Sequence, residues 1–258
     1  MRSNQLRARI AAGLVAGLVA FGFASSASKA AAAPQHAPRI PLSAKLATNA
    51  AWSSSNWSGY AKSSSTYSSI TGKWTVPSVS STSSATYSSS WIGIDGFNNS
   101  NLIQTGTEQD YYSGRAHYSA WWEILPAPAT TISLTIHAGD HMSASIKKGS
   151  NSMWTITISD TTSGHSFSTT KLYAGPQTSA EWIQEAPTVN GTQAKVAHYS
   201  TFPFDPGTVN GANPHLSSSN RGVMVQSGHQ VSTPSSQDSD TDGFRMAYGA
   251  TAPSPPSS

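Results

Sequence analysis

Hydrophobic and polar residues alternate in short runs along most of the chain after residue 50. In the segment 117–125, "HYSAWWEIL", Trp122 and Ile124 fall on one face of an extended strand, and Trp121 and Glu123 fall on the other. Successive side chains of a strand point to opposite faces, so a period of two indicates β-strands. The pattern therefore predicts a protein built mainly from strands.

Turn-forming segments separate these runs at short intervals. Segments such as "AGD", "KKGSNS", "DTTSGH" and "VNGT" lie between the clearest runs, which are "ITGKWTVP", "TYSSSWIGID", "AHYSAWWEIL", "TISLTIH", "HMSASI", "MWTITIS", "HSFSTTKLY", "AEWIQE" and "KVAHYSTF". Many short strands at this spacing are typical of an all-β sandwich or barrel. We expect no amphipathic helix after the N-terminal 32 residues, and a hairpin around Gly139 and Asp140.

Several of the expected strands carry an aromatic residue or an acid on the face opposite their aliphatic residues. In "WIGID", Trp91 and Asp95 lie opposite the two isoleucines, and in "AEWIQE", Glu181, Ile183 and Glu185 share a face. A core strand of a sandwich normally carries Ser or Thr on that face. Aromatic and acidic side chains together are typical of a groove that binds a substrate.

The first 32 residues have the pattern of an export signal. A basic stretch, "MRSNQLRAR", precedes the apolar run "IAAGLVAGLVAFGF", and small residues suited to cleavage follow. The apolar run is shorter than the roughly 20 residues that a membrane-spanning helix needs. The pattern predicts a secreted, extracellular protein with no membrane attachment once the signal is removed.

The remaining chain divides by composition. Residues 33–50, rich in Ala and Pro, are expected to form a linker or a short pro-segment, with ordered structure beginning near Trp52. Residues 51–250 are long enough for one large all-β domain. Residues 251–258, "TAPSPPSS", are expected to form a disordered tail.

Charge and cysteine content exclude several classes of function. Four of the 15 basic residues lie in the signal, which leaves 11 basic against 12 acidic residues, so nothing indicates binding to nucleic acid. The chain has no cysteine. Cysteine catalysis, thiolate metal sites and disulfides are therefore excluded.

Other familiar catalytic patterns are weak or absent. No G-x-S-x-G motif supports a serine nucleophile, and no D-T-G or D-S-G sequence supports an aspartic peptidase. His137 and His141 flank an expected turn and have no obvious third ligand. We expect no metal and no cofactor.

Carboxylates next to aromatic residues remain as candidates, namely Asp95, Glu123, Glu181 and Glu185. A glycosidase would need two of them across a cleft. A non-catalytic β-sandwich that binds carbohydrate or peptide would use the same aromatic face. These acids could also be ordinary strand residues with satisfied hydrogen bonds.

A glutamine, Gln104, lies inside the apolar run "NLIQTG". Burying its amide costs free energy unless hydrogen bonds satisfy it. From spacing alone, a structural amide that bridges strands is the better interpretation. Glu185, just before "AP", would by the same reasoning be an exposed carboxylate at the end of a strand.

Six motifs change this interpretation of Gln104 and Glu185, because they occur together and in order: "NWSGY", "WTVP", "WIGIDG", "LIQTG", "YSAWWEILP" and "AEWIQE". In this order they resemble the glutamic peptidases, or eqolisins, a family of acid endopeptidases. The resemblance spans roughly residues 56–185. It implies two large antiparallel sheets packed as a bent sandwich of the concanavalin A-like or jelly-roll type, with the active site on the concave face.

The resemblance also implies a catalytic pair and a cleft. Gln104 would stabilise the oxyanion, and Glu185 would activate water as general base and then act as general acid. The residues that correspond to the lining of the cleft, and are expected to bind substrate, are Trp57, Trp91, Asp95, Trp121 and Glu123. The expected partners are polypeptide substrates, and the expected state is a monomer. The chain departs from the fungal members in lacking cysteine, in its lower acidity and in having Ile124 and Leu125 where an aromatic pair is common.

Overall fold

The computed structural model describes residues 33–42 and 50–258, so the expected export signal lies outside the described residues. The strands, with one short 3₁₀ turn, are β1 (Trp52–Ser54), β2 (Trp57–Lys62), β3 (Ser69–Thr75), β4 (Ser89–Ile94), β5 (Ile103–Tyr112), β6 (Arg115–Ile124), β7 (Thr130–Ile132), β8 (His141–Lys148), β9 (Met153–Asp160), β10 (His165–Leu172), β11 (Ala180–Glu185), β12 (Thr188–Val189), β13 (Thr192–Gln193), β14 (Phe202–Val209), η1 (Ser218–Asn220), β15 (Arg221–Gln226), β16 (His229–Pro234) and β17 (Phe244–Tyr248). The expectation of an all-β protein is confirmed. Within the described ranges, no helix is long and apolar enough to cross a membrane.

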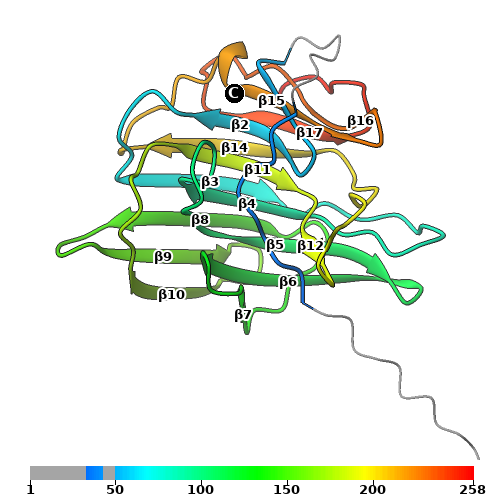
Figure 1. Ribbon diagram of the computed structural model, residues 1–258, viewed down its shortest axis with the longest axis horizontal. Helices are drawn as coiled ribbons and strands as arrows, with labels where there is room; N and C mark the ends of the chain where they lie inside the picture. The colour runs from blue at the N-terminus through cyan, green and yellow to red at the C-terminus, as the bar shows by residue number, and fades with distance from the viewer. Residues whose placement is uncertain (1–32, 43–49) are drawn as a thin grey trace, which may run out of the picture. The chain divides into compact units, whose positions relative to one another are not determined.

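One continuous hydrogen-bonded sheet contains nearly all of these strands (Figure 1). Its order is β10-β9-β8-β3-β14-β17-β16-β15-β2-β11-β4-β5-β6-β7, with β1 beside β15, and β12 pairs with β13 separately. The neighbours are antiparallel, except that β1 pairs with β15 in parallel. The two halves of this sheet face each other, because β8 packs against β4 and β5. This arrangement is the expected antiparallel sandwich.

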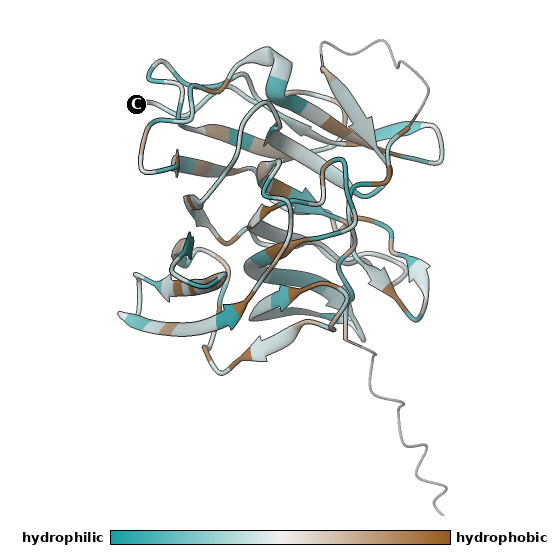
Figure 2. Ribbon diagram, turned by 60° about the vertical axis from the view of Figure 1, so that its left-hand side comes forward, coloured by the Kyte–Doolittle hydropathy of each residue, from teal (hydrophilic) through white to brown (hydrophobic). Residues whose placement is uncertain are grey.

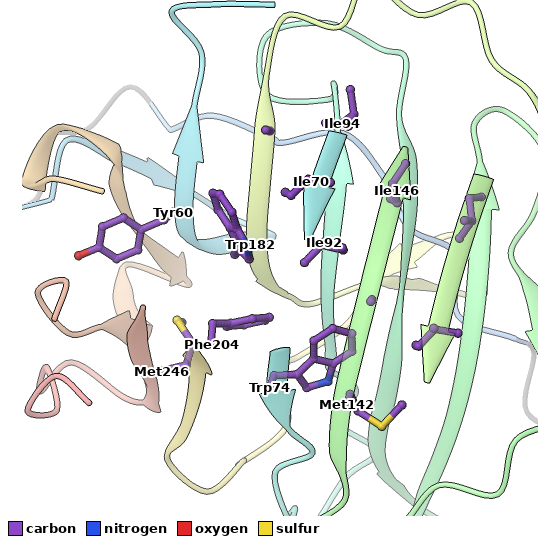
Figure 3. Close-up of a cluster of buried hydrophobic side chains, with 14 of the residues drawn as sticks. Tyr60, Ile70, Trp74, Ile92, Ile94, Met142, Ile146, Trp182, Phe204 and Met246 are labelled. Atoms are coloured by element: carbon purple, nitrogen blue, oxygen red, sulfur yellow. The ribbon is translucent and has the colours of Figure 1, made fainter. Parts of the chain in front are cut away.

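Large aromatic and aliphatic side chains fill the space between the two halves. Trp74 of β3 and Trp182 of β11 are almost fully buried there, beside Ile92 of β4 and Phe204 of β14 (Figure 3). Both indoles also reach across the core, since Trp74 Nε1 donates to Thr107 Oγ1 at 3.0 Å and Trp182 Nε1 donates to a β3 carbonyl at 2.8 Å. Each buried N–H is thereby satisfied.

The burial of side chains follows the period of two that the sequence shows. In β9, buried and partly exposed residues alternate, and hydrophobic and hydrophilic stretches interchange along the ribbons in Figure 2. The central strands β4 and β11 differ, because every residue in them is buried. Their second face, which points away from the core, must therefore be covered by other parts of the chain.

Two expectations about local structure need correction. The residues around Gly139 and Asp140 form a turn but no hairpin, because β7 pairs with β6 while β8 pairs with β3 in the other half of the sandwich. Ordered structure begins before Trp52, since residues 33–42 are hydrogen-bonded to the domain. The tail 251–258 has no strand, yet Pro256 within it is buried.

Candidate active site

Four neighbouring strands, β11, β4, β5 and β6, carry candidate residues on the face away from the core. Glu185 of β11 lies opposite Ser89 of β4, which lies opposite Glu108 of β5. Further along the same strands, Gln104 of β5 lies opposite Glu123 of β6. Directly opposite residues in a sheet point to the same side. Gln104, Glu108, Glu123 and Glu185 therefore share one face.

Glu185 is completely buried, contrary to the exposed strand-end position that spacing alone favours. Trp91 Nε1 donates to Glu185 Oε2 at 2.9 Å, and the backbone N–H of Ala37 donates to Oε1 at 3.1 Å. The Trp91 ring is itself held edge-on against Trp57, with ring centroids 4.9 Å apart. The two carboxylate oxygens are thus fixed in direction by donors from a strand and from the N-terminal segment.

The amide of Gln104 is also completely buried. Its Nε2 donates to Glu123 Oε2 at 2.6 Å, whereas its Oε1 is buried without a hydrogen-bond partner. Burial raises the pKa of Glu123 to about 7, the positive charge of His36 opposes this rise, and the charge of Glu185 adds to it. Glu123 therefore fixes the position of the amide, and the charge of Glu185 affects its pKa.

Aromatic side chains surround these groups. Trp57, Trp91 and Trp121 form a second buried cluster with Leu102 and Ile183, separate from the main core. The Trp121 indole donates from Nε1 to Ser89 Oγ at 3.1 Å, which fixes the ring beside Glu108 and Glu185. The expected aromatic and acidic face is therefore present.

The segment 33–42 covers this face and places His36 between two carboxylates. His36 Nδ1 lies 3.0 Å from Glu185 Oε2, and His36 Nε2 lies 3.0 Å from Glu108 Oε1. The imidazole stacks on Trp121 with ring centroids 3.6 Å apart. In Figure 1 this blue segment crosses the strands β4 and β5.

Backbone contacts hold the segment on both sides of His36. The N–H and carbonyl of Gln35 pair with the carbonyl and N–H of Thr188, each at 2.8 Å, and the N–H of Arg39 donates to Gly96 O at 3.0 Å. The Arg39 guanidinium lies 4.1 Å from the centroid of the Phe97 ring. The segment therefore lies across the site as an extended peptide.

The charges of His36 and of its carboxylate partners depend on one another. Burial alone would lower the pKa of His36, but the carboxylates of Glu108 and Glu185 raise it well above its ordinary value. Burial raises the pKa of Glu108, and the charge of His36 opposes this rise. His36 is thus a buried imidazolium that depends on its two carboxylate partners.

Asp95 is the expected site residue that the structure does not bring to this group. Its carboxylate accepts hydrogen bonds from Tyr173 Oη at 2.5 Å and from the backbone N–H groups of Gln177 and Thr178 at 2.8 Å. Asp95 has a φ of 73°, a left-handed backbone that this network holds in place. These contacts make it an anchor for the loop after β10.

The other candidates from the sequence, Glu181, His137 and His141, are not hydrogen-bonded to Gln104 or Glu185. Burial raises the pKa of Glu181 well above its ordinary value, and neither of its carboxyl oxygens has a hydrogen-bond partner. His137 has a side chain that is 72% exposed, and His141 Nδ1 lies 3.3 Å from Thr75 Oγ1. The two histidines share no candidate metal-ligand group among the described residues.

Sequence reasoning missed Glu108 and His36. Glu108 could have been found, because it follows Gln104 and Gly106 at intervals of two on the same strand face. His36 gave no comparable signal, since it lies in an Ala- and Pro-rich stretch whose docking depends on distant strands.

Parts of the sequence and the fold are shared with known peptidases. Residues 55–248 match the Peptidase A4 family. The chain is 33% identical to aspergillopepsin-2 of Aspergillus niger in an alignment of 159 positions that covers 51% of this chain and 56% of that protein. It is 31% identical to scytalidopepsin B of Scytalidium lignicola in an alignment of 157 positions that covers 57% of this chain and 59% of that protein.

These alignments span somewhat more than half the length of the two relatives. A crystal structure of scytalido-glutamic peptidase with a transition state analog inhibitor superposes with a TM-score of 0.65 and 26% identity, covering 75% of this chain and 98% of that chain. The family model spans most of the described domain. The chain therefore belongs to the peptidase A4 (eqolisin) family, as its ordered motifs predict.

Proposed function

We propose that this chain is an endopeptidase that hydrolyses peptide bonds in acid, with Gln104 and Glu185 as its catalytic pair. The observation that carries the proposal is the Gln104 amide. It is fully buried, and among the described residues its Nε2 donates to Glu123 alone, so a second N–H remains free on the face that also carries Glu185. A buried amide with unused hydrogen-bonding capacity is costly unless a ligand completes it.

Glu185 would act as the base and then as the acid. An ionised Glu185 takes a proton from a bound water, and the resulting hydroxide attacks the carbonyl carbon of the substrate. Glu185 then returns that proton to the leaving nitrogen as the C–N bond breaks. The donor Trp91 Nε1, 2.9 Å from Oε2, keeps the carboxylate aimed during both transfers. A carboxylate suits this role in acid, where a free histidine would be protonated.

Gln104 would stabilise the negative charge that develops on the carbonyl oxygen. One N–H of its amide is held by Glu123, so the other N–H is oriented and can donate to the oxyanion. A donor placed in this way typically contributes about 3–4 kcal/mol to the stability of the transition state. The role of Glu123 is then to position the amide.

The segment 33–42 would act as an internal inhibitor. Ala37 N and His36 Nδ1 occupy both oxygens of Glu185, so a water or a substrate cannot reach them until the segment leaves. Burial raises the pKa of Glu108, so this carboxylate is protonated at a higher pH than an ordinary glutamate. Acidification thereby removes one charged partner of His36. Acid would therefore both release the segment and suit the chemistry.

The remaining expectations belong to the same proposal. The chain would be exported and would act outside the cell as a monomer on polypeptides, with Trp57, Trp91 and Trp121 lining the groove. A non-catalytic module that binds carbohydrate or peptide is the alternative. Such a module could use the tryptophans, but it has no need for a buried amide beside two carboxylates.

The test compares Gln104→Ala with Gln109→Ala in the hydrolysis of an unfolded protein from pH 2 to 8. Both glutamines are fully buried in β5, but Gln109 Nε2 donates to Ser90 Oγ on the core side. We expect Gln104→Ala to lose about 10²–10³-fold in kcat and Gln109→Ala to stay within a few-fold when corrected for the folded fraction. No cleavage by folded wild type, or equal loss in both variants, would contradict the proposed role of Gln104.

A further inference from the structure

A second cluster of charged residues lies in the loop between β16 and β17. Residues 238–243 have the sequence "DSDTDG", in which three aspartates alternate with hydroxyl residues before a glycine. The same spacing, D-x-D-x-D-G, opens the calcium loop of EF-hand proteins, where the acids bind the ion and the glycine allows a sharp turn. That loop ends with a glutamate at its twelfth position, which here is Gly249. A further carboxylate would have to come from elsewhere.

Asp205 of β14 supplies a carboxylate from outside the loop. Oxygen atoms of Asp205, Asp238 and Asp242 lie within 4.8 Å of one another. A Cβ atom added to Gly243 would lie 2.5 Å from Asp238 Oδ2 and 2.7 Å from Asp205 Oδ1. Two carboxylates from different elements therefore converge over the same glycine.

The cluster contains buried oxygen atoms without partners. Asp238 is only 5% exposed, and its Oδ2 has no hydrogen-bond partner, while its Oδ1 accepts from Asp242 N at 3.1 Å. Asp242 Oδ1 is likewise buried and without a partner. A buried acceptor that lacks a donor or a cation is destabilising.

The carboxylates also repel one another. Their oxygen atoms lie within 4.8 Å of one another, and like charges at that separation disfavour one another. A bound cation would remove this repulsion.

We propose that Asp205, Asp238 and Asp242 bind one Ca²⁺ ion. Calcium accepts six to eight oxygen ligands in flexible geometry, whereas magnesium usually keeps several waters and takes one or two carboxylates. Three carboxylates from a loop and a strand, with water at the remaining positions, suit calcium. The ion would tie the loop 235–243 to β14, a role that a disulfide cannot fill in a chain without cysteine.

The test is calcium titration of the metal-depleted protein at pH 7.5, by calorimetry and by thermal unfolding. We expect one Ca²⁺ per chain, and a rise in Tm of roughly 5 °C when calcium reaches about 100 times its Kd. Asp238→Asn and, on the other element, Asp205→Asn should each weaken binding at least tenfold. A matched control is Asp160→Asn, since Asp160 binds only its own turn, through Thr162 N and Ser163 Oγ.

Three results would overturn the calcium site. These are no binding heat and no change of Tm in the wild type, an unchanged calcium affinity in both variants, and tighter binding of Mg²⁺ than of Ca²⁺. The two variants lie on different elements, so unfolding of one still leaves the other to decide. The outcome is independent of peptidase activity, because the readouts are binding and stability.

Discussion

His36 Nδ1 lies 3.0 Å from Oε2 of Glu185, the carboxylate proposed to activate water. The second nitrogen of the same imidazole lies 3.0 Å from Glu108, and the ring stacks on Trp121. A residue of the N-terminal segment is therefore bonded to the group on which the proposed chemistry depends.

Replacing His36 with Ala should activate the enzyme most at mildly acidic and neutral pH. The pKa of His36 is raised, so the imidazolium and its contact persist through neutral pH and are lost only as the pH rises past that raised value. Toward acid, protonation of Glu108 weakens the contact. We expect His36→Ala to raise the rate near pH 6 by roughly 10–100-fold, the value of one hydrogen bond to a charged group, and to change it little in strong acid.

The measurement is the initial rate of hydrolysis from pH 3 to 7. His141→Ala is the control, since it removes an exposed histidine from β8. Identical pH profiles for wild type and His36→Ala would show that the segment does not restrain the site.

Replacing Gln104 with Glu should abolish activity, although the two side chains have nearly the same shape. The new carboxyl would lie where Nε2 now donates to Glu123 at 2.6 Å, so one of the two acids would have to hold a proton. The donor for the oxyanion would be lost whenever the new acid ionises. We expect a fall in kcat of at least about 10²-fold in a chain whose circular dichroism spectrum is that of wild type. Activity within a few-fold of wild type would contradict the donor role.

Replacing Glu123 with Gln should make stability less dependent on pH. The pKa of Glu123 is raised to about 7 in the folded chain, so its contribution to stability is complete below about pH 4.5 and is lost as the pH rises through 7. That loss is at most about 3 kcal/mol, and the Glu123→Gln variant would not show it. Urea unfolding at pH 4 and at pH 8 measures the difference. An equal fall in stability for both proteins would refute the assignment.

Replacing Gly106 with Ala should destabilise the floor of the site. A Cβ at this position would lie 2.3 Å from the carbonyl oxygen of Ser90 and 2.5 Å from Trp91 Cβ, so β4 and β5 would have to separate. We expect a loss of about 1–3 kcal/mol and a fall in activity, because Trp91 orients Glu185. Gly149→Ala is the matched control, since its nearest neighbour is Met153 O at 3.4 Å. Thermal unfolding should give a lower Tm for Gly106→Ala than for Gly149→Ala. Equal Tm values would contradict the close packing of β4 against Gly106.

The sequence predicted the sandwich and the shared face of Trp121 and Glu123 within one strand, because alternation is local and survives in the folded sheet. It did not predict which strands pair. The turn at residues 137–140 was recognised correctly, and the Asp140 carboxylate does bond His137 N at 2.7 Å. The strands on either side nevertheless join opposite halves of the sandwich, a choice made by long-range packing.

The same limit applies to the candidate site. Gln104 and Glu185 were identified from ordered motifs, whereas spacing alone favoured a structural role for both. The contacts of His36, and those of Asp95 with Tyr173 and Gln177, join residues more than 70 positions apart, so no local pattern reports them. Burial of Glu185 follows from the segment 33–42, which composition alone indicated to be a linker or pro-segment.

The most direct test of the proposed chemistry is the pH–rate profile of Glu185→Gln beside Glu181→Gln. Both acids are fully buried on the same face of β11, but the carboxyl of Glu181 has a raised pKa and no hydrogen-bond partner, so an amide should replace it at little cost. We expect cleavage in acid by wild type and by Glu181→Gln, and none by Glu185→Gln at any pH. Wild-type turnover by a folded Glu185→Gln protein would show that Glu185 is not the catalytic base.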